Sequence, residues 1–118
     1  MAEVKRAERV AERMREELSW ILTREVRDPG AAGAIVSRVE MTDDLKTVRV
    51  YVRTLEGKVG KAIVDLLAAL KRASRMLRRQ VTTRVGLRFA PELRFFYDDR
   101  LDTVNRIEEL LEEVKREK

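Results

Sequence analysis

The stretch KAIVDLLAALKRASRMLRRQVTTRV, Lys61 to Val85, decides the fold expected for this chain. Its apolar residues fall on one side of a helical wheel drawn at about 100° per residue. These residues are Ile63, Leu66, Leu67, Leu70, Leu77 and Val81. The pattern predicts one long helix, or two consecutive helices, with one buried side and an end at Gly86.

The segments on both sides of this helix have the alternation of β-strands. Ile35–Met41 is rich in β-branched residues, and residues 48–52 alternate valine with Arg49 and Tyr51, so residues 42–46 form a hairpin loop. Residues 87–97 alternate again, but Pro91 lacks a backbone donor, which predicts a late start, a bulge or an edge position. The long helix therefore crosses over between the second and third strands.

Two further amphipathic segments complete the predicted order of elements. Apolar residues step by three and four through residues 3–27, where Asp28-Pro29-Gly30 stops the helix. A last helix is expected at about 103–116, with Asp102 or Thr103 as its N-cap. The prediction is a single α+β domain, residues 1–118, in which helices cover one face of a three-stranded sheet.

The composition excludes several classes of function. The chain has no Cys and no His, so it lacks thiolate chemistry and the commonest general base. It has no long apolar run and no phosphate-cradling loop motif, so a membrane span and most enzyme classes are disfavoured. The charged N-terminus has no apolar signal region, which indicates a cytoplasmic protein. Asp98, Asp99 and Asp102 suit a turn and a helix cap better than a cation site.

Positive charge is concentrated in one part of the chain. The net charge is +5, but residues 57–90 carry nine basic residues and only Asp65 as an acid. A surplus confined to one segment is typical of a site for a polyanion such as RNA or DNA. The alternative is a solvated helix face without a ligand.

The proposed phosphate contacts lie on the side of the central helix opposite its apolar stripe. They are Lys61, Lys71, Arg72, Arg75, Arg78 and Arg79, with Arg84, Arg88 and Lys58 as weaker candidates. A helix lying on a membrane surface would carry similar charge, but here the apolar side is needed for the core. The stripe therefore favours nucleic acid.

Three other features have a structural and a functional interpretation. The sequence of residues 57–60 matches the GxxG clamp of KH domains, yet it follows a strand, so a strand-to-helix turn is favoured. Trp20 covers the core edge or marks a partner surface. Phe95, Phe96 and Tyr97 could stack on bases, although at least two of them are expected in the core.

At this point the sequence resembles a known family. LRFAPELRFFYDD (Leu87 to Asp99), VEMTDDLKTVRVYV (Val39 to Val52) and REVRDPG (Arg24 to Gly30) resemble segments of ribosome-binding factor A. The run ending in LLAALKRASRMLRRQVTTRVGLR fits in order and spacing. The resemblance covers roughly Val4 to Leu111.

The resemblance implies a KH-like fold of the second type without a GxxG clamp. In its place the family has an Ala-x-Gly kink, which maps onto Ala73, Ser74 and Arg75. The third residue departs from the pattern, because Arg has no special tolerance for positive φ. The kink region, with Ala73 and Ser74, is then expected at the RNA-binding surface beside the basic residues.

The resemblance also implies a function. The chain would bind free immature 30S small ribosomal subunits and 16S rRNA and assist late 30S maturation and 16S rRNA processing, including at low temperature. It would need no cofactor or metal, would not be an enzyme, and nothing demands more than a monomer. The alternatives are a protein-interaction module, docked through the first helix or Trp20, and a generic KH-like RNA binder not tied to the ribosome.

Overall fold

The computed structural model describes residues 2–55, 57, 60–99, 111 and 114 of the 118-residue chain. In chain order the elements are α1 (Ala2–Glu25), a 3₁₀ turn η1 (Pro29–Ala31), β1 (Ile35–Met41), β2 (Thr47–Arg53), α2 (Lys61–Val85) and β3 (Glu92–Tyr97). The predicted last helix, about 103–116, lies outside the described residues apart from Leu111 and Val114. No helix in the described part of the chain is long and apolar enough to cross a membrane.

The three strands form one mixed sheet in the order β1-β2-β3. β1 and β2 are antiparallel and are joined by the predicted hairpin loop, whereas β2 and β3 are parallel. A parallel pair requires a crossover, and α2 supplies it. β3 begins directly after Pro91 and lies at the edge of the sheet, which confirms two of the three possibilities that the proline left open.

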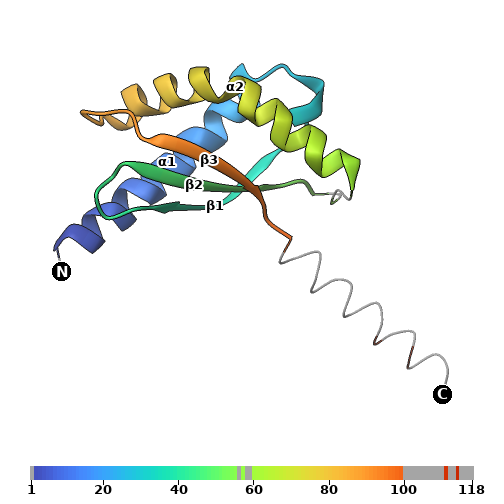
Figure 1. Cartoon of the computed structure of the whole chain (residues 1–118), viewed down its shortest axis with the longest axis horizontal. Helices are drawn as coiled ribbons and strands as arrows, with labels where there is room; N and C mark the ends of the chain where they lie inside the picture. The colour runs from blue at the N-terminus through green and yellow to red at the C-terminus, as the bar shows by residue number, and fades with distance from the viewer. Residues whose placement is uncertain (1, 56, 58–59, 100–110, 112–113, 115–118) are drawn as a thin grey trace.

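Both helices pack on the same face of this sheet. Val48, Val50 and Val52 point toward the helices and are fully buried, while Arg49 between them is exposed. The same core cluster includes α1 residues such as Leu18 and α2 residues such as Leu70. Figure 1 shows α1 crossing behind the strands and α2 running beside β3. The predicted α+β architecture is confirmed.

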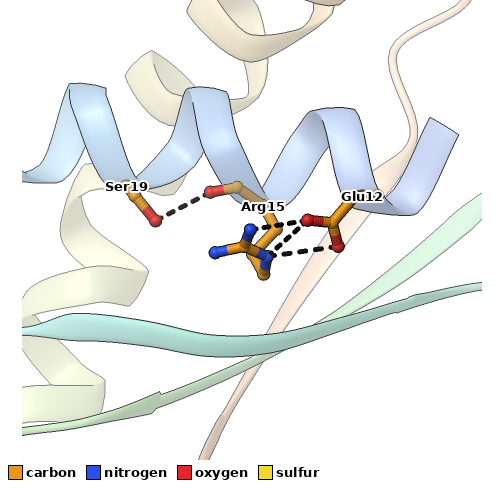
Figure 2. A network of polar contacts seen from close by, with 3 residues as sticks. All are labelled: Glu12, Arg15 and Ser19. Carbon is orange, nitrogen blue, oxygen red and sulfur yellow. Dashed lines mark hydrogen bonds and ion pairs between the residues drawn. The ribbon is translucent and has the colours of Figure 1, made fainter. Parts of the chain in front are cut away.

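The outer surface of α1 carries charges that are paired within the helix. The Arg15 guanidinium donates to the Glu12 carboxylate, with 3.1 Å from Nε to Oε1, and the Ser19 hydroxyl donates to the Arg15 carbonyl at 2.7 Å (Figure 2). A side-chain ion pair at i,i+3, such as Glu12 with Arg15, stabilises a helix by a few tenths of a kcal/mol. The polar face of α1 is thus partly occupied by its own contacts.

The segment after α1 is drawn tightly against α2. α1 ends at Glu25, two residues before the predicted end, and the Asp28 carboxylate accepts the Gly30 N–H at 3.0 Å to cap η1. A Cβ on Gly30 would lie 3.2 Å from the Asp65 carbonyl oxygen and 3.2 Å from the Ala69 Cβ. A side chain at position 30 would therefore require the turn or α2 to give way by a few tenths of an ångström, and glycine avoids this.

α2 is one continuous helix across Ala73, Ser74 and Arg75. Figure 1 shows its yellow-green and gold halves inclined to each other, so the helix bends without breaking. Arg75 has no positive φ; among non-glycine residues in the described structure only Leu45 has one. The bend therefore requires no glycine at the third position. Gly86 ends the helix in the left-handed region, as predicted, and its N–H donates to the Thr82 carbonyl.

Candidate nucleic-acid interface

A groove of about 920 Å³ runs along the molecule between α2 and the edge strand β3. The helix contributes one wall and the strand the other. The lining residues are Val64, Leu67, Ala68, Lys71, Ser74, Arg75 and Arg78 from α2, and Glu92, Leu93, Arg94, Phe95 and Phe96 from β3. Four of the nine residues predicted for RNA binding, Lys71, Ser74, Arg75 and Arg78, are thus brought together in one groove.

The groove combines an apolar floor with a basic rim. Leu67, Leu93 and Phe95 are partly buried and pack against the core, whereas Lys71 and Arg75 are exposed. A groove with an apolar floor and a basic rim suits a nucleic acid strand, because the bases can contact the apolar floor while the phosphates contact the cations of the rim.

Lys71 and Arg75 are the cations most available to a ligand. Neither makes an ion pair or a side-chain hydrogen bond with any described residue. Arg78 also lies in the groove, but its guanidinium donates to the Ala90 carbonyl at 2.7 Å and so ties the segment before β3 to α2. A phosphate at Arg78 would therefore add to, or replace, an existing contact.

Four predicted cations lie on α2 outside the groove lining, and three of them are Lys61, Arg72 and Arg79. Lys61 and Arg79 are exposed and have no partner in the described part of the chain. Arg72 is exposed as expected, but it pairs with Asp28 of the η1 turn at 2.8 Å. Arg72 thus fastens the turn to α2 and is less available to phosphate than its neighbours.

The Asp28–Arg72 contact makes the free energy of unfolding depend on pH in the acid range. Hydrogen bonding from Arg72, and then from the Gly30 N–H, holds the pKa of the Asp28 carboxyl below its ordinary value. The contribution of this contact to the free energy of unfolding is fully present above the unfolded-state pKa, about 3.9. It is lost as the pH falls through the lower folded-state pKa. Asp28→Asn should therefore lose less stability than the wild type between about pH 5 and pH 2.

Urea unfolding at several pH values tests this prediction. Asp43→Asn, at an exposed hairpin position, is the matched control and should keep the wild-type pH dependence. Arg72→Ala should resemble Asp28→Asn, and the double variant should add little more, since both remove one contact. If Asp28→Asn and the wild type lose the same free energy of unfolding as the pH falls, the role given to the Asp28–Arg72 contact is wrong.

Arg84 belongs to a different part of the surface. Its guanidinium pairs with Glu17 and lies 4.0 Å from the Trp20 ring centroid, while Arg24 lies 4.7 Å from the same ring. The Arg84 hydrogen bond is the main reason why the pKa of Glu17 is lowered. Trp20, 37% exposed, therefore covers the α1–α2 junction under two arginines, and Arg84 does not line the groove.

The described residues among the remaining candidates do not line the groove. Ala73 is partly buried and packs against the core. Gly57 and Gly60 lie in the connection between β2 and α2, where the strand-to-helix interpretation placed them, and Lys58 lies outside the described residues. Arg88 lies 5.6 Å from the Phe89 ring centroid and does not line the groove.

The acidic residues at the end of β3 do not gather around a cation position in the described structure. Asp98 is buried and accepts the Ser37 hydroxyl at 2.7 Å, while Asp102 lies outside the described residues. Within the described ranges no group of three potential ligands could hold a metal ion. Asp98 instead ties the end of β3 to β1.

Sequence reasoning missed the contribution of β3 to the groove. Arg94 and Phe96 line it, and Phe95 contributes to its floor. Phe95 and Tyr97 pack on the core, as predicted for at least two of the three aromatic residues of this segment. That the free edge of β3 faces the basic side of α2 was not visible in the sequence.

The sequence of this chain is similar to those of known proteins. The profile of the family described as ribosome-binding factor A matches residues 6–111. Ribosome-binding factor A of Sorangium cellulosum is 55% identical over 113 residues, covering 95% of this chain and 90% of that protein.

Two similar structures come from Thermus thermophilus. The crystal structure of its ribosome-binding factor A has a TM-score of 0.66 at 24% identity, covering 77% of this chain and 94% of that chain. A homology model of the same factor, fitted into a cryo-EM map of its complex with 30S, has a TM-score of 0.63 at 26% identity, covering 76% of this chain and 92% of that chain.

Proposed function

This chain belongs to the ribosome-binding factor A family, and we propose that it binds free, immature 30S subunits, contacts their 16S rRNA and assists late 30S maturation and rRNA processing. The relative fitted into a 30S complex supports the partner. The observation that carries the RNA contact is the groove between α2 and β3, whose rim holds Lys71 and Arg75 without a described ion pair. Exposed cations along a groove are the electrostatic pattern by which proteins bind a phosphate backbone, and this supports the proposal.

The proposed contacts divide into two sets by position. Lys71, Arg75 and Arg78 line the groove with Ser74, and Lys61 and Arg79 extend the same charge along α2. Arg72 and Arg84 are already bound to Asp28 and Glu17, so they hold the scaffold that presents the others. Phosphate contacts position a protein but read no sequence. Specificity should then come from the folded shape of the rRNA, into which the bent helix and the groove fit.

The proposed activity is binding alone. No catalytic step and no cofactor are invoked, and the expected place of action is the cytoplasm, where small subunits are assembled. A monomer is sufficient, because one chain contains both walls of the groove. A role at low temperature is part of the same proposal.

Sedimentation of a cell extract through a sucrose gradient tests the proposal. The protein should migrate with free small subunits and be absent from full ribosomes. If it stays at the top of the gradient even at low salt, the ribosomal function is wrong. Binding that survives nuclease treatment of the partner fraction would indicate a protein partner instead. Equal binding to unrelated single strands would indicate a generic RNA binder.

A further inference from the structure

The face of the sheet away from the helices carries a row of stacked side chains. Arg38 of β1 pairs across the sheet with Tyr51 of β2, and Tyr51 pairs with Phe96 of β3. The Arg38 guanidinium lies 3.9 Å from the Tyr51 ring centroid. The rings of Tyr51 and Phe96 stack with centroids 5.4 Å apart and an angle of 27° between their planes. One cation and two rings thus form a continuous column across all three strands.

The column is open at the Phe96 end. β3 is the edge strand, so within the described part of the chain no further strand continues the row beyond Phe96. Phe96 is 40% exposed and also lines the groove between α2 and β3. Its ring therefore stands where the outer face of the sheet meets the proposed RNA groove. A planar group at this point would extend the column by one member.

The surroundings of this open end are basic. Four arginines and two glutamates point outward from the three strands: Arg38, Arg49, Arg53 and Arg94, with Glu40 and Glu92. Glu40 is shared by Arg38 and Arg49, and Glu92 pairs with Arg94 at 3.3 Å. Arg94 remains 58% exposed in its side chain and lies two residues from Phe96 on the same face. An excess of positive charge beside an exposed ring fits a nucleotide better than an apolar peptide.

We propose that Phe96 stacks on one unpaired nucleobase of the bound RNA, whose backbone runs along the Lys71 and Arg75 rim. This inference rests on the proposed rRNA binding and adds to it a position that requires single-stranded RNA. Tyr51 and Arg38 hold the Phe96 ring in place, so they act as positioning residues. Stacking tolerates any base, because every base has a π-face.

The competing explanation is that Phe96 serves only as a cross-strand packing partner of Tyr51. Cross-strand pairs of this kind stabilise a sheet modestly. Under this explanation, losing the ring would change stability but not the preference for unpaired RNA. The two explanations therefore differ in their effect on binding selectivity.

The test compares Phe96→Ile with wild type on two probes, an adenosine decamer and the same decamer paired with its uridine complement. Isoleucine keeps apolar volume and suits a strand but has no π-face. Affinity for the single strand should fall about 5- to 100-fold, while affinity for the duplex should not change. The slope of log affinity against log salt should stay the same, since no phosphate contact is lost. Phe96→Tyr should restore wild-type binding.

Phe89→Ile is the matched control, because Phe89 is 78% exposed and does not line the groove. It should bind both probes as the wild type does. Urea unfolding should show that Phe96→Ile is folded; Phe96→Leu gives the same comparison if it is not. Unchanged single-strand affinity, or an equal loss on both probes, would overturn the stacking role.

The outcome is separable from that of the proposed function. If the wild type sediments with free small subunits and Phe96→Ile binds the decamer normally, only the stacking inference fails. If the wild type binds the decamer through Phe96 but does not sediment with subunits, the ribosomal partner is wrong and the stacking residue stands. If it binds neither, both fail.

Discussion

Replacing Lys71 and Arg75 together by alanine should weaken binding to free small subunits roughly 25- to 60-fold in about 0.1 M salt. Both side chains are exposed on the groove rim and lack a described ion pair, so their charge is available to release counterions from phosphate. If about five phosphates are neutralised, the wild-type slope of log affinity against log salt should lie between about −3 and −5. The double variant should flatten that slope by about 1.4 to 1.8.

The matched control removes two charges elsewhere. Arg6→Ala with Arg9→Ala changes the net charge equally on the exposed side of α1, where neither arginine has a described partner. Its slope should remain that of the wild type. Titrations of labelled protein with purified small subunits at four or five salt concentrations give both numbers. Equal flattening in the two double variants would show that net charge, and not the groove, determines binding.

Leu77→Ala should lower the free energy of unfolding by about 2–5 kcal/mol. Leu77 is fully buried in α2, in the core that the two helices share with β2. Truncation removes its transfer free energy and leaves a cavity that a close-packed interior only partly fills. A domain of this size has about 5–15 kcal/mol in total, so the loss is a large share of it.

Urea unfolding followed by circular dichroism measures this loss. Leu55→Ala is the matched control, because Leu55 is 82% exposed and the same atoms are deleted. Its effect should stay within about 0.5 kcal/mol. At urea concentrations below its unfolding midpoint, Leu77→Ala should bind subunits as the wild type does, since the Leu77 side chain lies in the core and does not line the groove. A similar loss for both variants would contradict the core assignment.

The strands and helices could be predicted from local patterns. The valine alternation in β2 and the apolar stripe of α2 each report one buried face, and burial on one face is what determines these periodicities. Pro91 and Gly86 marked a strand start and a helix end because each restricts or requires a particular backbone conformation. The end of α1 was predicted two residues late, since the capping of η1 by Asp28 competes with continuation of the helix.

The candidate site could be predicted only in part. The charge surplus and the helical wheel placed Lys71, Arg75 and Arg78 on one side of α2, and the groove contains all three. The same reasoning grouped Arg72 with them and kept Arg84 as a weaker candidate, although both arginines are engaged in ion pairs. Their partners, Asp28 and Glu17, come from segments 44 and 67 residues away in sequence. A wheel gives the direction of a side chain but not what lies opposite it.

By itself, then, the sequence determined the type and order of the elements from α1 to β3, the buried face of each of these, and the segment that carries the positive charge. These properties depend on residues within a few positions of one another. Only the tertiary structure decided which cations are free, that β3 forms the second wall of the groove, and that Phe96 ends an open column with Arg38 and Tyr51. These three properties depend on strand register and on the crossover of α2, which bring distant residues together. They do so because the helices and the sheet bury their apolar faces in one common core.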